Sequence, residues 1–127
     1  MKALKLSVFA STLVIAMSFA NAAHAARTTY GTAGDDILYG ASGKDIIYGY
    51  DGNDKLYGSS GSDVLYGGNG NDKLYGSTGS DKLYGGNGND YLEGFTGSDK
   101  YYAGSGFDVC YNLTGSPYYS SCETIKR

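Results

Sequence analysis

Apolar side chains recur at a spacing of nine residues between Gly31 and Tyr111. Nine blocks follow one another without a gap: GTAGDDILY, GASGKDIIY, GYDGNDKLY, GSSGSDVLY, GGNGNDKLY, GSTGSDKLY, GGNGNDYLE, GFTGSDKYY and AGSGFDVCY. The first six positions of a block are mostly glycine and polar residues, whereas positions 7 to 9 are mainly apolar or aromatic. This pattern predicts a tight turn followed by a three-residue strand in every block.

Individual positions of the block carry further information. Position 4 is always glycine, and position 1 is glycine in every block but the last, where Ala103 replaces it. Glycine permits the backbone angles that tight turns require. Position 8 is Leu or Ile in the first seven blocks, and Tyr101 and Cys110 occupy it in the last two. Because successive side chains of a strand point to opposite faces of the sheet, we expect the side chain at position 8 to face inward. Tyrosine at position 9 and lysine at position 7 should then face water.

A block with one inward side chain cannot bury it alone, so the blocks must stack as a solenoid. A second period lies within the first. Odd-numbered blocks have turns such as GGNGND in their first six positions, whereas even-numbered blocks have turns such as GSTGSD. We therefore expect an all-β fold with an 18-residue coil of two turns and two strands. Odd-block turns would stack along one edge (the odd edge), and even-block turns along the other (the even edge).

Position 6 is aspartate in all nine blocks, and stacking places these carboxylates in two columns. Coils about 4.8 Å apart would bring neighbouring carboxylates close enough to repel by roughly 3 kcal/mol at an effective dielectric of 20. A hard divalent cation between them would convert repulsion into ligation, and oxygen ligands favour Ca²⁺ over Zn²⁺ or Cu²⁺. The odd edge would hold Asp36, Asp54, Asp72, Asp90 and Asp108, and the even edge Asp45, Asp63, Asp81 and Asp99.

An alternative is that the aspartates are purely structural and cap turn amides without a metal, as aspartate commonly does in turns. An EF-hand does not explain them, because no D-x-[DN]-x-[DN]-G loop with a glutamate at its twelfth position occurs.

The blocks resemble the RTX (hemolysin-type calcium-binding) nonapeptide G-G-x-G-x-D-x-U-x over residues 31–111. The resemblance implies a parallel β-roll with Ca²⁺ between the turns of blocks n and n+2, and the nine aspartates as side-chain ligands in seven pairs. Even blocks lack an amide or carboxylate at position 3, so the better sites are expected on the odd edge. Position 3 holds Asp51, Asn69 and Asn87 there.

The first 25 residues have the pattern of a signal peptide. Lys2 and Lys5 precede an apolar run over residues 6–20, and Ala23-His24-Ala25 follows as a small-x-small cleavage site. Cleavage after Ala25, or alternatively after Ala22, would leave no membrane span; a membrane anchor is the other interpretation, although the run is short for one. Loss of both lysines would change the formal net charge from -3 to -5. This negative charge, together with the lack of a cluster of basic residues, argues against nucleic-acid binding. Residues 26–30 are a lead-in to the roll.

Two cysteines, Cys110 and Cys122, remain after cleavage, and an exported chain with an even cysteine count suggests a disulfide. The bond would pin residues 112–127 as a cap across the open end of the solenoid.

Two further arrays have alternative interpretations. The tyrosines of position 9 are either an aromatic ladder that stabilises the sheets or a binding face. The Ser/Thr side chains of even-block position 3 are either ordinary turn residues or an array similar to that of some ice-binding adhesin domains. The first array comprises Tyr39, Tyr57, Tyr75 and Tyr111 on one sheet and Tyr48, Tyr66, Tyr84 and Tyr102 on the other; the second comprises Ser42, Ser60, Thr78 and Thr96.

These observations predict a secreted or periplasmic calcium-binding protein with a structural or surface-associated role, whose roll folds on binding Ca²⁺. The alternative is a recognition protein that binds ice, a glycan or an extracellular surface. We expect no enzyme, because the mature chain has no histidine and no nucleophile with a neighbouring base.

Overall fold

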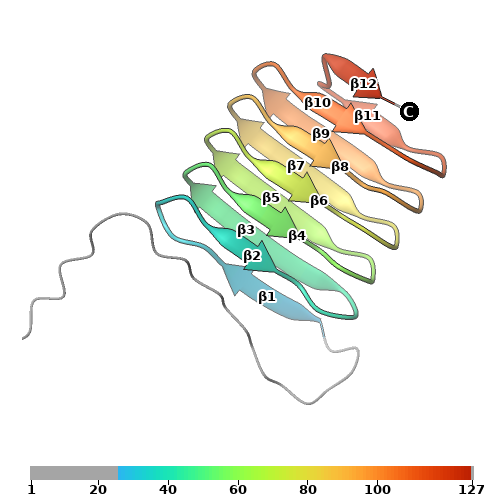
Figure 1. Cartoon of the computed structure of the whole chain (residues 1–127), viewed down its shortest axis with the longest axis horizontal. Coiled ribbons are helices and arrows are strands. Elements are labelled where there is room, and N and C mark those ends of the chain that lie inside the picture. The colour runs from blue at the N-terminus through green and yellow to red at the C-terminus, as the bar shows by residue number, and fades with distance from the viewer. Residues whose placement is uncertain (1–25, 127) are drawn as a thin grey trace, which may run out of the picture.

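The computed structural model describes residues 26–126, which form two six-stranded parallel sheets and no helix (Figure 1). The predicted signal peptide lies outside the described residues. Sheet A, in spatial order, contains β1 (Arg27–Tyr30), β3 (Asp45–Asp51), β5 (Val64–Asn69), β7 (Lys82–Asn87), β9 (Lys100–Ser105) and β11 (Tyr118–Ser120). Sheet B contains β2 (Ile37–Tyr39), β4 (Lys55–Tyr57), β6 (Lys73–Tyr75), β8 (Tyr91–Glu93), β10 (Val109–Tyr111) and β12 (Thr124–Lys126).

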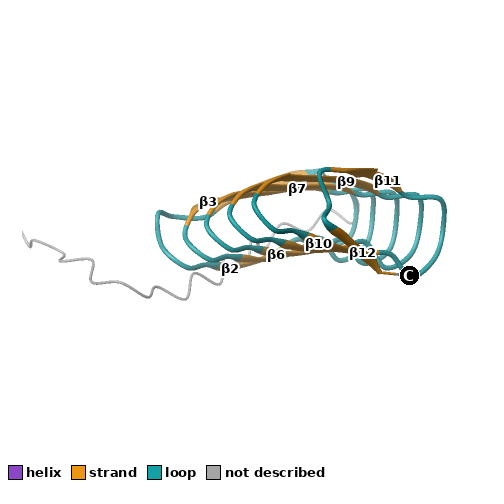
Figure 2. Cartoon of the chain, turned by 90° about the horizontal axis from the view of Figure 1, so that it is seen from above, coloured by secondary structure: helices purple, strands orange, loops and turns teal. Residues whose placement is uncertain are grey.

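The chain winds alternately through the two sheets as a flattened coil, with turns along both edges (Figure 2). Strands of the repeat region pair with the strand 18 residues away, as in the register of Leu56 with Leu74 and of Leu65 with Leu83. The predicted all-β solenoid with two nonapeptides per coil is therefore confirmed.

The core is a ladder of the position-8 side chains, which are fully buried between the two sheets, as the alternation predicted. Neighbours on both sheets and in the coils above and below are needed to cover each of them, so the hydrophobic stabilisation belongs to the stack and not to any one repeat. The ladder contains Leu38, Ile47, Leu56, Leu65, Leu74, Leu83, Leu92, Tyr101 and Cys110, and Ala103 joins it from position 1.

Glycine at position 4 is required by the close approach of successive turns. A Cβ on Gly70 would collide with the carbonyl oxygen of Gly52 in the preceding coil, and Gly70 also has a φ of +130°. Position 2 has a positive φ in seven of the nine blocks, and in four of these the residue is not glycine: Tyr50, Ser59, Ser77 and Phe95. Each such residue stores strain of about 1–3 kcal/mol that the surrounding stack must offset.

The coil continues beyond the nine blocks at both ends. Strand β1 adds Arg27 beside Asp45, at the position that aspartate occupies in later coils. Residues 112–120 form a further turn and strand, with Thr114 bridged to Thr96 and Tyr118 in register with Lys100. Strand β12 then pairs with β10 at an offset of 15 residues, because the last turn is three residues shorter.

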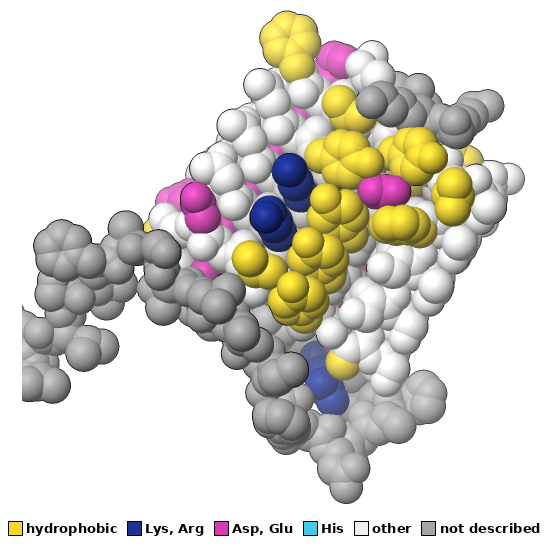
Figure 3. All heavy atoms as spheres, viewed as in Figure 1, with side chains coloured by type: hydrophobic (Ala, Val, Ile, Leu, Met, Phe, Trp, Pro, Cys, Tyr) yellow, Lys and Arg dark blue, Asp and Glu magenta, His cyan; other side chains and the backbone are white. Residues whose placement is uncertain are grey.

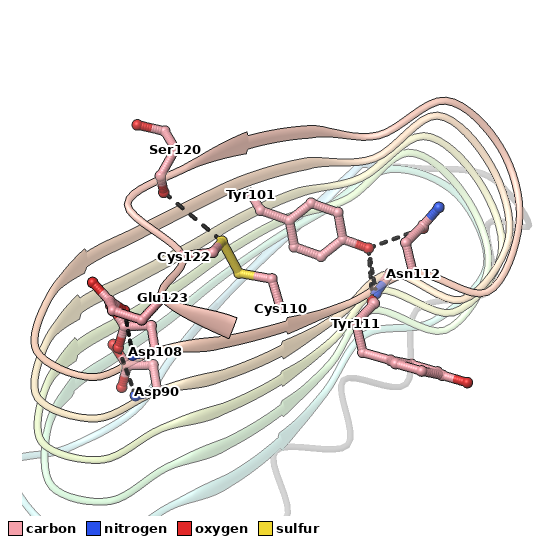
Figure 4. The surroundings of a disulfide bond; sticks show 10 residues. Asp90, Tyr101, Asp108, Cys110, Tyr111, Asn112, Ser120, Cys122 and Glu123 are labelled. Atoms are coloured by element: carbon pink, nitrogen blue, oxygen red, sulfur yellow. Dashed lines mark hydrogen bonds between the residues drawn. A yellow bond between two sulfur atoms is a disulfide. The ribbon is translucent and has the colours of Figure 1, made fainter. Parts of the chain in front are cut away.

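A disulfide holds this last turn against the end of the core (Figure 4). It joins Cys110 of β10 to Cys122, whose Cα atoms are 5.9 Å apart, which confirms the predicted bond. Cys122 and the half-buried Tyr119 pack on the core, and the Tyr119 ring stacks on Tyr101 at 4.9 Å. The C-terminal end of the roll is thus covered by its own tail.

Tyrosine rings form columns on the outer face of each sheet. On sheet A, five rings stack from Tyr30 to Tyr102, with successive centroids 4.6–5.4 Å apart. On sheet B, the stack runs from Tyr39 to Tyr75 and ends near Glu93, and a pair of basic side chains lies beside it (Figure 3). In-register pairing places Lys55 next to Lys73 on this face.

Candidate metal centre

The nine position-6 aspartates lie where each turn enters a strand, and all nine are at most 2% exposed. The turn bends back over the carboxylate, so burial follows from the two glycines that let the turn close. As predicted, the side chains form one column along each edge of the roll.

Successive aspartates of a column are joined by hydrogen bonds between coils. The backbone N–H of one aspartate donates to Oδ1 of the aspartate 18 residues later, as Asp54 does to Asp72 at 2.8 Å. Seven such bonds, 2.7–3.0 Å long, join the seven pairs that the repeat predicted. At the end of the odd column, Glu123 replaces the next aspartate, and its Oε2 accepts the Asp108 N–H at 2.6 Å.

Each of the nine carboxylates has a second oxygen with no hydrogen-bond partner in the described protein. In seven of them this atom is the buried Oδ2, and in Asp36 and Asp45, which begin the columns, it is Oδ1. A buried carboxylate oxygen without a donor costs about 1–3 kcal/mol or more. Such a set of unpartnered oxygens indicates that the columns are built to hold another group.

The missing side chain at position 1 leaves a space lined by oxygen atoms. A Cβ on Gly58 would lie 2.6 Å from Oδ2 of Asp63 and 2.8 Å from the carbonyl oxygen of Gly76 in the next coil. A carboxylate oxygen and a carbonyl oxygen from successive coils meet in this way at six positions: Gly31, Gly40, Gly49, Gly58, Gly67 and Gly85. The carbonyl oxygens are donors that side-chain patterns in the sequence did not single out.

Burial raises the pKa of seven column aspartates: Asp54, Asp63, Asp72, Asp81, Asp90, Asp99 and Asp108. Desolvation is the main cause, the hydrogen bond from the preceding aspartate N–H opposes it, and neighbouring carboxylates add to the increase. The pKa reaches about 7 for Asp63 and Asp72. It reaches about 6 for Asp54, Asp81 and Asp90. A negative charge in either column is therefore costly unless a cation balances it.

The donor set fits a hard cation such as Ca²⁺, which takes six to eight oxygen ligands. The unpartnered carboxylate oxygens and the position-1 carbonyls are oxygen donors only. Among the described residues, no three His, Cys, Asp or Glu side chains group together as a metal site, so backbone oxygens and water would have to complete the coordination. The nine aspartates and these carbonyls are the groups that would hold the ion.

The position-3 residues of the odd edge lie apart from this buried set. Their exposed side chains form a ladder in which Asn69 donates to Asp51 at 2.7 Å and Asn87 donates to Asn69 at 2.8 Å. A second exposed ladder at position 5 runs through Asp35 and Asn53. These contacts stabilise the odd edge directly, and a ligand role for Asp51, Asn69 and Asn87 remains a prediction.

Tyr101 changes the last site of the even column (Figure 4). Its hydroxyl lies in the space at Gly94, beside Oδ2 of Asp99. In most other coils the same space is lined by a carboxylate oxygen and a backbone carbonyl oxygen, and no side chain enters it. The hydroxyl accepts from the Gly94 N–H at 2.9 Å and contacts Oδ1 of Asn112 at 3.0 Å. The sequence marked Tyr101 as an inward residue, but not that its hydroxyl would reach the aspartate column.

The tyrosine columns present a different surface from a flat aromatic platform. Rings inside each column are covered on both faces by their neighbours, so their edges and hydroxyl groups face the solvent. Stacking of a sugar on these ring faces is therefore not supported for the central coils.

In the part of the chain that the structure covers, we found no helix with the length and apolar character to cross a membrane.

A parallel β-roll with buried aspartates on glycine-rich turns defines a class of repeat protein built around cation-binding turns. Comparison with protein families finds the RTX calcium-binding nonapeptide repeat (4 copies) at residues 30–65, 48–83 and 75–110, which together cover more than half of the chain. The chain belongs to this family. Comparisons with curated proteins and with solved structures gave no match.

Proposed function

We propose that this is an exported calcium-binding protein whose β-roll folds when Ca²⁺ enters the aspartate columns. The observation that carries the proposal is the set of nine buried carboxylates, each with one oxygen that lacks a hydrogen-bond partner. Oxygen-only donors, with backbone carbonyls opposite the carboxylates, support Ca²⁺ as the ion.

Coupled folding follows from the energetics of the columns. Without a cation, folding must desolvate the carboxylates and bring them into a row, and the core offers little more than one apolar side chain per repeat to offset this. A cation shared by two coils removes the repulsion and joins the coils at the same time. Binding free energy then becomes folding free energy, because the site does not exist in the unfolded chain.

The proposed location is outside the cytoplasm, either in the periplasm or beyond the cell. The N-terminal pattern of a signal peptide over residues 1–25 supports export. The disulfide also supports it, because disulfides persist in oxidising compartments. Extracellular binding modules commonly have calcium affinities in the range of about 10⁻⁴–10⁻³ M, which suits a chain that folds only after export.

We propose a structural or surface-associated role rather than recognition or catalysis. The tyrosine rings are largely occupied by one another, so a ladder that strengthens the sheets explains them. The Ser/Thr line of the even edge is joined by backbone bridges from Ser42 to Thr114, which makes it part of the roll. An ice-recrystallisation assay and a glycan array on the folded protein should both be negative.

Circular dichroism during calcium titration tests the main proposal. The β signal should appear with Ca²⁺ at near-neutral pH and disappear in excess chelator, while Mg²⁺ at the same concentration should be less effective because it prefers rigid octahedral sites. A double variant, Asp63→Ala with Asp72→Ala, should require more calcium, whereas Lys82→Gln with Lys100→Gln, at exposed positions of sheet A, should match the parent. A β signal that persists unchanged in chelator would contradict the proposal.

A further inference from the structure

The two ends of the roll differ in how they are finished. At the C-terminal end, the disulfide, Tyr119 and β12 close the coil, and Glu123 completes the aspartate column. At the other end, β1 and β2 are the edge strands of their sheets, and only Ala26 precedes β1 among the described residues. An open edge strand is a template for pairing with another chain.

Buried and aromatic groups at this N-terminal end lack the neighbours that later coils have. Oδ1 of Asp36, a residue only 1% exposed, has no donor, whereas from Asp54 onward Oδ1 accepts an N–H from the coil before. Tyr30 and Tyr39 begin the tyrosine columns and are 57% and 50% exposed. The first coil thus presents the uncovered faces of these two rings.

Charge is also distributed differently in the first coil. On the even edge it carries the exposed Lys44 at position 5, where later coils have Ser62, Ser80, Ser98 or Ser116, while Arg27 lies beside the buried Asp45. On the odd edge it carries Asp35 at position 5, where later coils have asparagine or Phe107. The N-terminal end is therefore basic along one edge and acidic along the other.

We propose that the N-terminal end binds a second copy of this chain, end to end, about a two-fold axis perpendicular to the sheets. This axis exchanges the two edges, so the basic edge of each copy faces the acidic edge of its partner. It also places β1 antiparallel to β1 of the partner, which extends sheet A across the interface. Two-fold interfaces of this self-complementary kind are the commonest in homo-oligomers.

Head-to-tail association is disfavoured by the same charges. Continuing the coil from the C-terminal end of one copy would set the exposed Glu123 against Asp35 and Asp36 of the next, because odd edges would align. The even edge at that end offers Lys44 no acid, since Asn112, Ser116 and Pro117 occupy the last turn. With one end closed, the assembly stops at a dimer and does not grow into a filament.

This inference rests on the proposed export, because removal of residues 1–25 leaves Ala26 as the first residue and adds its α-ammonium group to the basic edge. The interface is the cross-section of a single coil, which is smaller than the roughly 800 Å² per partner of a standard interface. We therefore expect a dissociation constant on the order of micromolar or weaker.

Sedimentation analysis of the exported chain, in calcium and over a range of protein concentrations, tests the dimer. Dimer should form with increasing concentration, and no larger species should appear. Variant Lys44→Glu, and separately variant Asp35→Lys, should each raise the dissociation constant about tenfold or more through like-charge contacts. Mixing the two variants should restore dimerisation, because each then faces the opposite charge.

Lys73→Glu, in the middle of sheet B, is the matched control and should dimerise like the parent. A monomer at every concentration, a filament, or a dimer indifferent to both charge variants would overturn the inference. Mass spectrometry and circular dichroism of the same samples separate the two proposals: a retained leader contradicts export, and calcium-independent folding contradicts the proposed function. A calcium-folded monomer that begins at Ala26 contradicts only the dimer.

Discussion

Each position-6 aspartate from Asp54 to Asp99 combines two structural roles in one side chain. Oδ1 accepts a hydrogen bond that joins two coils, and Oδ2 faces the oxygen-lined space at position 1. The residue is therefore a coil connector as well as a candidate ligand. The two roles respond differently when the charge is removed and the shape is kept.

Asp72→Asn separates the two roles. The amide oxygen still accepts the Asp54 N–H, while one negative charge leaves the odd column. At near-neutral pH we expect the calcium-free chain to gain about 1 kcal/mol in unfolding free energy, and calcium binding to weaken about tenfold or more. Thermal unfolding in chelator and calcium titration measure the two effects, with Glu93→Gln on the outer face as the control. A loss of stability without calcium and no loss of affinity would contradict this assignment.

Tyr101→Phe tests the hydroxyl that lies beside Asp99. The variant leaves the buried Gly94 N–H without its acceptor, so the calcium-free chain should lose about 1–3 kcal/mol of unfolding free energy. The space at Gly94 becomes free, so equilibrium dialysis should detect one more calcium ion per chain than in the parent. Tyr102→Phe, whose ring lies in the outer column, should change neither quantity. Unchanged stoichiometry would show that the hydroxyl does not block a site.

At the scale of single residues, the sequence predicted the functional side chains that recur at a fixed position of the repeat, and it did not predict the other groups of the site. The nine aspartates were predictable because the period places them in register. The position-1 carbonyls and the Tyr101 hydroxyl were not, because backbone oxygens have no sequence signature and a tyrosine at position 8 indicates only burial. The preference for the odd edge remains a prediction, since both columns have the same hydrogen-bond geometry.

At the scale of strands and turns, the coil length was predictable from the alternation of two block types. The continuation through residues 112–120 was harder to recognise, because Asn112 and Pro117 replace the glycine and aspartate of positions 1 and 6. Thr114, Gly115 and Ser116 match the even blocks and were the available signal. Strand β12 was hidden because a deletion of three residues breaks the period.

The disulfide should stabilise the last coil by restricting the unfolded chain. Its cysteines are 12 residues apart, and closing a loop of this size contributes about 3 kcal/mol. The double variant Cys110→Ala with Cys122→Ala should lose about this much stability in calcium, and hydrogen exchange should increase first in β12. The parent protein in reductant provides the matched comparison. Equal stability of the oxidised and reduced forms would contradict a stabilising role.

At the scale of the whole molecule, the aspartate columns make the calcium-free roll sensitive to pH. The folded pKa of about 6–7 for five of these aspartates lies above the usual value of 3.8. Between about pH 4 and 7 the folded chain thus binds more protons than the unfolded chain, so stability falls as pH rises through this window.

The calcium-depleted chain should therefore keep its β signal near pH 4 and lose it toward pH 8, where added Ca²⁺ should restore it. Circular dichroism at constant ionic strength measures this directly. A calcium-free chain that is more stable at pH 8 than at pH 4 would show that the carboxylates are not protonated on folding.

The tyrosine columns also make the molecule its own spectroscopic reporter. The chain has fourteen tyrosines and no tryptophan, so its near-ultraviolet absorption comes almost entirely from phenol rings. Rings stacked 4.6–4.8 Å apart and nearly parallel should couple electronically, which isolated tyrosines in an unfolded chain do not. Exciton bands in the near-ultraviolet therefore follow the alignment of successive coils, whereas the far-ultraviolet signal follows the backbone, and the order in which the two arise can be timed without any label.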